Sequence, residues 1–359
     1  MGAEGGEGNS LPRDVGKLAL LSMRYGAGHY LAALALRQAF EHFGVDAELY
    51  DSIKSGGLPE RLSEAFYNFT QRRAHWLWAL LYYNPLSASR LGRWFMASLH
   101  RRTFDCLKGL KPEAVVATHF TSADLACRLG IRTFTVITDF VLHPLWLSCA
   151  ERYFVAWEGL ARELGPKAEV TGIPLRKGFW SLPSKAEARR KLGVPPGEPV
   201  VLLMAGAGGA TDLTEIARRL RGVYILAVAG RNERLREKFK EVVEKGRVFG
   251  FTEEVHLLLA ASDATVSKGG GIYTSEALAA ATPIVFFGSM PGQERGNERV
   301  VVSQGAGLSA RSAAEASERL LEILEDKSLK EKMEEAAGKL GRPRAALKIA
   351  EKVLELIRG

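Results

Sequence analysis

Two successive series of short apolar segments, each alternating with helix-like segments, most strongly limit how this chain folds. Runs with the length and composition of buried strands occupy 17–23, 45–51, 114–119, 132–139 and 152–157, and then parts of 200–210, 223–230, 247–251, 264–271 and 283–288. Segments with helical spacing separate many of them, for example 30–44, 122–130, 212–220 and 253–263. This alternation predicts an α/β fold with two doubly wound, Rossmann-like halves.

The length of the chain agrees with two domains. It has 359 residues, of which 47% are hydrophobic and 25% charged, a balance typical of globular proteins. We expect an N-terminal domain over 14–172, a C-terminal domain over 173–341 and a final helix over 342–359 that packs back on the first domain. The connection near 171–176 predicts a hinge, and the segment 181–199 is expected to be a loop.

Several classes of protein are disfavoured by what the sequence contains. No apolar run reaches the ~20 residues that span a bilayer, and the glycine-rich start lacks the features of a secretory signal, so we expect a frayed tail. Cys106, Cys127 and Cys149 are not spaced as zinc ligands, and we expect buried thiols in a reducing cytoplasm and no metal site. The net charge of +8 predicts attraction to polyanions.

Three consecutive glycines, Gly269 to Gly271, precede a helix-like run that carries Glu276. Glycines let backbone N–H groups approach a ligand closely, and a helix N-terminus attracts anions, so this arrangement suits a phosphate. A tight turn explains it equally well from this stretch alone. A dinucleotide fingerprint is incomplete in both "GAGHYL" (26–31) and "GAGGAT" (206–211), and the phosphate-binding P-loop of kinases is absent.

Five motifs in order and register carry a family resemblance over about 17–307. They are "RYGAGHYLAALAL" (24–36), "VITDFVLHPLW" (136–146), "VTGIPLR" (170–176), "VSKGGGIYTSEALA" (266–279) and "PGQERGNERVV" (291–301). The chain resembles the GT-B glycosyltransferases that include monogalactosyldiacylglycerol synthases and processive diacylglycerol glucosyltransferases. The N-acetylglucosaminyltransferase that forms lipid II is a more distant relative. The resemblance implies a GT-B fold, in which two Rossmann-like domains face a cleft.

The resemblance also implies which residues hold a UDP-sugar. Gly270 and Gly271 would hold the diphosphate, Glu276 the ribose and Arg176 the charge on the leaving diphosphate, without a metal or cofactor. The remaining expected contacts with the nucleotide-sugar come from Gly208, Gly209, Gly250, Phe251, Ser275, Gln293, Glu294 and Asn297. Two positions depart from the family pattern: Gly269 replaces proline and Tyr273 replaces threonine.

The acceptor side is expected in the N-terminal half. His29 is our first candidate for the general base, because imidazole titrates near neutral pH, and Asp139 is the second. Gly28, His143 and Trp146 are expected to line the acceptor site. Each has a purely structural alternative: His29 as a helix cap, Asp139 as a strand-end residue, and His143 with Trp146 as a pair in the core.

The stretch 66–104, called here the aromatic-basic segment, contains no Asp or Glu. Its rings and arginines suit a membrane interface, where rings lie among headgroups and cations contact anionic lipid. We assign Trp76, Trp78, Trp94, Arg72 and Arg73 to lipid binding, and expect the six arginines of the segment to lack local partners. A nucleic-acid surface or two buried amphipathic helices remain alternatives, although with the family motifs the membrane is favoured.

Together these features predict an inverting transferase that moves a hexose from a UDP-sugar to a lipid hydroxyl, most simply that of diacylglycerol. We expect a peripheral enzyme on the cytoplasmic face of an anionic membrane, with no nucleic-acid partner. A UDP-sugar 2-epimerase of the same fold and a non-catalytic UDP-sugar sensor are the alternatives. The sequence leaves the choice between UDP-glucose and UDP-galactose open.

Overall fold

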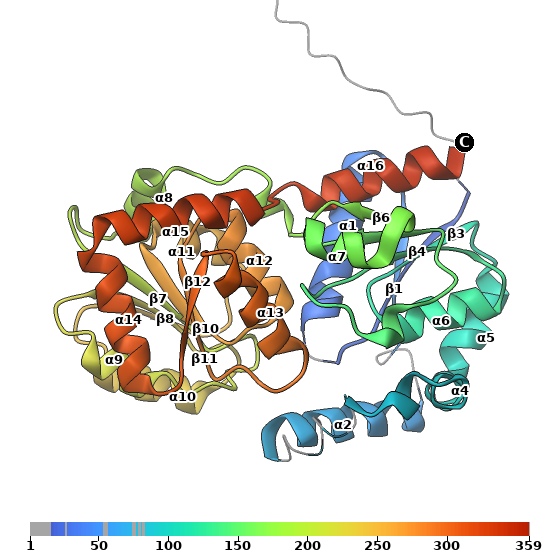
Figure 1. Ribbon diagram of the computed structural model, residues 1–359, viewed down its shortest axis with the longest axis horizontal. Helices are drawn as coiled ribbons and strands as arrows, with labels where there is room; N and C mark the ends of the chain where they lie inside the picture. Colours follow the sequence, from blue (N-terminus) through green and yellow to red (C-terminus); the bar gives the residue numbers. More distant parts are fainter. Residues whose placement is uncertain are drawn as a thin grey trace, which may run out of the picture.

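Two parallel six-stranded sheets form the framework of the protein (Figure 1). The computed structural model describes residues 16–25, 27–52, 57–73, 77, 80 and 83–358. The first sheet has the strand order β2 (Ala47–Asp51), β1 (Leu18–Ser22), β3 (Ala114–Ala117), β4 (Arg132–Val136), β5 (Arg152–Val155), β6 (Ala168–Val170). The second has the order β12 (Gly307–Ala310), β11 (Ile284–Phe287), β10 (Ala264–Ser267), β7 (Val200–Met204), β8 (Tyr224–Val228), β9 (Gly246–Phe249).

Helices cover both faces of the sheets, as parallel sheets require. The first sheet is flanked by α1 (Gly28–His42), α5 (Arg101–Leu110), α6 (Phe120–Arg128), α7 (Glu158–Leu164) and α16 (Ala345–Arg358). The second is flanked by α8 (Lys185–Leu192), α9 (Thr214–Arg219), α10 (Glu233–Val242), α11 (Val255–Ala261), α12 (Gly271–Ala279), α13 (Gln293–Ser303), α14 (Ala313–Glu325) and α15 (Lys327–Leu340). Short 3-10 turns lie at Pro85–Ala88 (η1), Pro144–Trp146 (η2), Gly165–Lys167 (η3) and Lys177–Phe179 (η4).

The C-terminal helix returns to the first half of the molecule. In Figure 1, α15 lies over the second sheet, and α16 continues across to the first, beside α1. Ile349 and Val353 of α16 are fully buried in one cluster with Leu36 and Phe40 of α1 and Leu20 of β1. The apolar stripe of this helix therefore completes one face of the N-terminal core.

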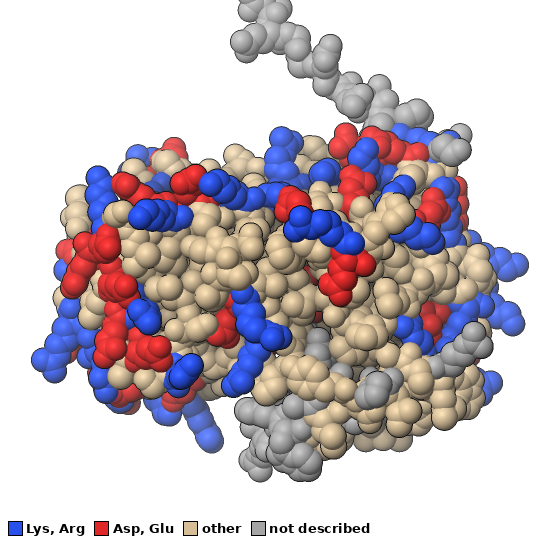
Figure 2. Space-filling view, in the orientation of Figure 1, with Lys and Arg blue, Asp and Glu red and all other residues tan. Residues whose placement is uncertain are grey.

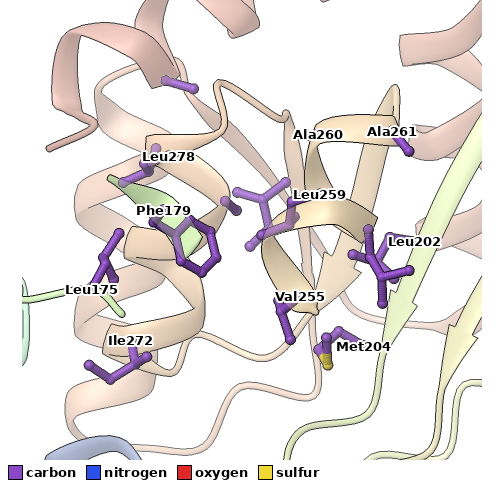
Figure 3. Packing of buried hydrophobic residues seen from close by; sticks show 14 of the residues in the cluster. Leu175, Phe179, Leu202, Met204, Val255, Leu259, Ala260, Ala261, Ile272 and Leu278 are labelled. Carbon is purple, nitrogen blue, oxygen red and sulfur yellow. The ribbon is translucent and has the colours of Figure 1, made fainter. Parts of the chain in front are cut away.

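A continuous apolar cluster joins the two halves. Leu175 and Phe179, which follow β6, are almost completely buried against α12 and α11 of the second half. Figure 3 shows Leu175 and Phe179 beside Ile272 and Leu278, with Leu259 to the right of Phe179. Ala32 and Phe140 of the first half belong to the same cluster. The two halves are therefore packed against each other through side chains on both sides of the predicted hinge.

The predicted fold class is confirmed, but two expectations are wrong. The segment 181–199 is not only a loop, because α8 forms within it. Ser184 accepts a hydrogen bond from the Glu187 backbone N–H, and the Glu187 carboxylate accepts one from the Ser184 backbone N–H. This reciprocal capping box satisfies the first turn, and Gly193 ends the helix in a left-handed conformation.

The second correction concerns the cysteines, which were expected to be buried thiols. Cys127 and Cys149 form a disulfide, with their Cα atoms 5.8 Å apart, and Cys106 is free and exposed. The bond joins the end of α6 to the loop that follows η2. Spacing along the chain does not reveal the pair, because folding brings together two positions 22 residues apart.

The aromatic-basic segment forms α2 (Leu58–Arg73, which begins before it), η1, α4 (Arg90–Ser98) and the start of α5. Figure 1 shows α2 and α4 together at the lower edge of the first half. Most of the exposed large apolar side chains of the described chain lie here: Leu58, Leu62, Phe66, Phe69, Leu80, Tyr83, Leu86, Leu91, Trp94 and Phe95. This edge in Figure 2 is correspondingly poor in red and blue atoms. Trp76 and Trp78 lie outside the described residues, and the side chains of Arg72 and Arg73 are likewise not described.

Candidate active site

The loops at the carboxyl ends of both sheets meet between the two halves. In an open α/β sheet, ligands bind where the strand order reverses direction. The reversal lies between β1 and β3 in the first sheet and between β7 and β10 in the second. Residue 29 follows β1, residues 118 and 119 follow β3, and residues 268–271 follow β10. The predicted site residues on these loops are thus brought to one place by the topology.

His29 lies on the first turn of α1 and is a plausible proton acceptor. Its Nδ1 is 2.8 Å from the carbonyl oxygen of Thr118 and 2.9 Å from the hydroxyl of Thr138. The carbonyl can only accept, so Nδ1 carries the proton and Nε2 is left with a free lone pair. Burial lowers the pKa of His29 to about 4, which keeps the ring neutral at physiological pH. His29 therefore does not act as a helix cap.

Asp139 and Asn297 join the two halves by hydrogen bonds. The Asn297 amide nitrogen donates to Asp139 Oδ1 at 3.0 Å and to the Gly269 carbonyl at 2.9 Å, and its oxygen accepts from the Phe140 backbone N–H at 2.7 Å. Burial raises the pKa of Asp139 to about 6, and the nearby Glu294 adds to this. Asn297 is completely buried, so its side chain acts here as a link between the halves and offers no free group to a sugar.

The three-glycine loop requires two of its glycines for packing. A Cβ at Gly269 would lie 2.2 Å from the Glu294 carbonyl oxygen, so this chain cannot keep the proline of the family pattern here without a shift. A Cβ at Gly271 would lie 1.9 Å from the carbonyl oxygen of Thr138. Gly270, the N-cap of α12, has open space around it. The Gly269 and Gly270 N–H groups already donate to Ser289 Oγ and to the Lys268 carbonyl oxygen, so the N-terminus of α12 at Gly271 is the part of this loop that suits an anion.

Glu276 and Arg176, predicted to contact different parts of a nucleotide, contact each other. Arg176 donates to Glu276 Oε1 at 3.1 Å, and both side chains are largely buried. Burial raises the pKa of Glu276, while the guanidinium of Arg176 opposes that rise. The second carboxylate oxygen of Glu276, Oε2, takes no part in the hydrogen bond with Arg176. Arg176 Nε is buried with no hydrogen-bond partner in the described part of the chain.

The loop before α13 supplies further polar groups. Glu294 is not free, because it pairs with Lys268 at 2.5 Å and accepts from the Met290 backbone N–H. Lys268 immediately precedes the three glycines and adds a positive charge that sequence reasoning overlooked. The Gln293 side-chain oxygen is buried and has no hydrogen-bond partner among the described residues. An unpartnered buried acceptor of this kind suits a ligand hydroxyl.

The other predicted nucleotide contacts surround the second sheet. Gly208 has open space around it, whereas Gly209 adopts a left-handed conformation in which a Cβ would lie 2.2 Å from the Ala229 carbonyl oxygen. Gly250 follows β9, and the exposed ring of Phe251 has the Arg231 guanidinium 4.4 Å from its centre. Ser275 is mostly buried on α12, in contact with a small cavity beside Gly172. The structure thus brings Gly208 to an open position but uses Gly209 for packing.

Several aromatic side chains lie together on the acceptor side, and the sequence analysis identified only some of them. Trp146 is buried, its ring centre 6.2 Å from that of His29 and 5.8 Å from that of Phe120. His143 caps η2 by accepting from the Leu145 backbone N–H, and Gly28 lies near Ile272 of α12. His119 was missed: it is buried with its ring centre 4.8 Å from that of His29. Its position directly after a buried strand was the available signal.

Arg93 corrects the expectation that the arginines of the aromatic-basic segment lack local partners. Its guanidinium donates to the carbonyl oxygens of Ala88, at 3.1 Å, and Pro144, at 2.6 Å. Pro144 begins η2, the turn that carries Trp146. Arg93 therefore fastens the aromatic-basic segment to the loop beside His29.

Comparison with known families identifies the chain. Residues 29–175 match the family model for monogalactosyldiacylglycerol (MGDG) synthase, and residues 184–340 match that for glycosyl transferases group 1. The chain is a GT-B glycosyltransferase. A processive diacylglycerol beta-glucosyltransferase from Bacillus cytotoxicus is 29% identical, over 94% of this chain and 93% of that protein. One from Bacillus mycoides is 27% identical with the same coverage. The resemblance predicted from the five motifs is therefore confirmed.

Solved structures support the fold of this glycosyltransferase at low sequence identity. MurG from Acinetobacter baumannii has a TM-score of 0.61 and 15% identity over 95% of this chain and 99% of its own. The spinosyn rhamnosyltransferase SpnG has a TM-score of 0.64 and 14% identity over 94% of this chain and 100% of its own. These likenesses establish the GT-B arrangement of the glycosyltransferase and nothing finer.

The described residues contain neither a membrane-spanning helix nor a metal-binding cluster. None of their helices combines the length and the apolar character needed to cross a membrane. In the same residues, no group of three or more His, Cys, Asp or Glu side chains is arranged to hold a metal ion.

Proposed function

We propose that this glycosyltransferase moves a hexose from a UDP-sugar to the free hydroxyl of diacylglycerol and inverts the anomeric carbon. The observation that carries the proposal is the position of His29, neutral and with Nε2 unprotonated, across from the N-terminus of α12. A base on one side and an anion-binding helix end on the other suit a single displacement. The names of the full-length relatives favour glucose as the hexose and diacylglycerol as the acceptor.

The proton of the acceptor would pass to His29. As the lipid oxygen bonds to the anomeric carbon and the bond to the diphosphate breaks, Nε2 takes the hydroxyl proton. Burial lowers the pKa of His29, but the negative diphosphate would raise it because a nearby anion stabilises the imidazolium. The hydrogen bond from Nδ1 to Thr118 holds the ring in the required tautomer.

The charge on the departing UDP would be met by the protein. The backbone N–H group of Gly271 and the dipole of α12 favour an anion at this position, while the Gly270 N–H donates to the Lys268 carbonyl oxygen. Lys268 lies on the same loop, but its positive charge is offset by the ion pair with Glu294. Glu276 Oε2, held in place through Oε1 by Arg176, would accept hydrogen bonds from the ribose.

The aromatic-basic segment would hold the enzyme on a membrane, from which diacylglycerol enters. Leu91, Trp94 and Phe95 of α4 are 74%, 58% and 57% exposed, and Leu147, beside η2, is 49% exposed. Arg93 links α4 to η2, so these side chains border the loop next to His29. Arg101 and Arg102 are exposed at the start of α5 and would face anionic headgroups. We place this surface on the cytoplasmic face of the membrane.

A donor and acceptor screen tests the proposed function. The purified protein is incubated with UDP-glucose or UDP-galactose, with and without vesicles that contain diacylglycerol, and the lipids are analysed by mass spectrometry. We expect a hexosyl-diacylglycerol that forms only when both substrates are present. UDP release without any lipid would favour the epimerase, and donor binding without turnover on any acceptor would favour the sensor. Either result would contradict the proposal.

Removing the rings of α4 should weaken membrane binding. If the exposed parts of Trp94 and Phe95 enter the interface, each contributes about 1 kcal/mol, so the double variant Trp94→Ser, Phe95→Ser should bind vesicles about 30-fold less tightly. Co-sedimentation with vesicles measures this. Phe251→Ser is the matched control for binding, because Phe251 is an exposed ring on the other half. Equal losses in both variants would contradict a specific docking surface on α4.

A further inference from the structure

A second cavity lies at the base of the aromatic-basic segment, and none of its lining residues belongs to the candidate active site. Its volume is about 90 Å³. Side chains from the end of β2 and from α5 supply its polar lining: Tyr50, Asp51, Ser52, Arg102, Thr103 and Cys106. The chain leaves the first sheet towards α2 at Ser52 and returns through α5, so the cavity lies between the two ends of this excursion.

Two buried hydroxyl groups in the cavity lack partners. Ser52 is 1% exposed and Thr103 is 6% exposed, and neither hydroxyl oxygen has a hydrogen-bond partner within the described ranges. Buried polar groups in native proteins are almost always paired, with protein, water or ligand. Two such groups on one small cavity indicate a place where a polar molecule binds.

The charges around the cavity favour an anion. Asp51 also lines it, but this carboxylate pairs with Arg24 and is thereby neutralised. This leaves Arg102 as the cation among the lining side chains, while Glu48, outside the lining, interacts with Tyr50. Its planar guanidinium suits the paired oxygens of a phosphate, and Ser and Thr hydroxyls donate readily to the same oxygens.

We propose that this cavity binds a phosphate-type oxyanion through the hydroxyls of Ser52 and Thr103 and the guanidinium of Arg102. Since a water needs roughly 10–15 Å³ of such volume, the cavity has room for a group of several heavy atoms. A free phosphate or the phosphoryl headgroup of a lipid would supply this chemistry. A bound anion would connect the two ends of the excursion that carries α2 and α4.

Cys106 provides a direct test, because it lines the cavity and is the one cysteine of the three outside the disulfide. We expect inorganic phosphate to slow alkylation of Cys106 by an uncharged maleimide, compared with chloride at equal ionic strength. Arg102→Gln should weaken the phosphate affinity seen in this assay by about tenfold or more, the loss expected for one charge-assisted hydrogen bond. Arg101→Gln, one residue earlier on the same helix, is the matched control and should retain protection.

A second variant and an experiment with lipid vesicles complete the test. Thr103→Val removes one hydroxyl at nearly constant volume and should also weaken protection, with its thermal unfolding midpoint measured to establish folding. Vesicles with phosphatidic acid should protect Cys106 in an Arg102-dependent way if a lipid headgroup can enter, whereas protection by free phosphate alone identifies a soluble anion. Absence of protection by either, or equal losses of protection by free phosphate in Arg101→Gln and Arg102→Gln, would overturn the proposal.

Discussion

Replacing His29 with alanine should lower kcat by about 10²–10⁴-fold, the usual contribution of a general base. UDP affinity should change little, because His29 belongs to the N-terminal half and the expected UDP contacts lie in the other. Steady-state kinetics on diacylglycerol vesicles and calorimetric titration with UDP measure the two effects. His42→Ala is the matched control, since His42 ends the same helix and its ring packs beside those of Phe43 and Trp180. A kcat for His29→Ala within a few-fold of wild type would exclude His29 as the base.

The pH dependence of kcat/KM separates His29 from Asp139 in the same preparation, because this quantity reports the groups of the free enzyme. Burial lowers the pKa of His29 to about 4 and raises that of Asp139 to about 6. Each group can take the proton of the acceptor only while it is itself unprotonated, which is above its own pKa. If His29 is the base, activity should stay level as the pH falls through 6 and decline only near pH 4. A decline centred near pH 6 would show that ionised Asp139 is required.

Replacing Glu276 with alanine should damage both stability and nucleotide binding. Glu276 and Arg176 form a largely buried ion pair, and removing one partner of such a pair costs about 3–5 kcal/mol because the other charge is left unpaired. The lost hydrogen bonds to the ribose should weaken UDP binding by about 1.5–3 kcal/mol. Denaturant unfolding measures the free energy of unfolding, and calorimetry measures the UDP affinity.

The variant Glu276→Gln distinguishes the two roles of this side chain. Its amide keeps the shape and can still accept a hydrogen bond from Arg176, so stability should fall less than in Glu276→Ala. UDP binding should still weaken, because a neutral acceptor bonds ribose hydroxyls less strongly than a carboxylate. A folded Glu276→Gln or Glu276→Ala protein with wild-type UDP affinity would remove Glu276 from the binding site.

The parts of the fold that the sequence predicts best are the buried strands. Strands of a parallel sheet are covered on both faces and therefore form continuous apolar runs, as Leu18–Ser22 and Val200–Met204 do. Short edge strands with polar or small residues, such as Ala168–Val170 and Gly307–Ala310, give no such signal. Helix α8 was missed although its capping box is visible in the sequence, because the surrounding prolines and glycines favour a loop.

The same contrast holds for the candidate site: some of its residues stand in local sequence motifs, whereas other features depend on tertiary contacts. His29 and the three glycines were found because motifs are local, and the open space at Gly270 agrees with the expected role of that loop. The hydrogen bonds of Asn297 to both halves and the disulfide of Cys127 were not predictable, since they depend on segments that meet only after folding. Arg93 illustrates the same limit. The composition of the segment around it suggested a lipid contact, but after folding its guanidinium donates to backbone carbonyl oxygens.

The crowding around the three-glycine loop has a consequence for directed evolution of the donor preference. At Gly269 and Gly271 a single added carbon would collide with the backbone of Glu294 or Thr138, so libraries that randomise these codons would consist mostly of misassembled proteins. Gly270 alone among the three has room for a side chain. A saturation library confined to this codon would introduce new side chains beside the expected diphosphate position and leave the contacts between the halves intact.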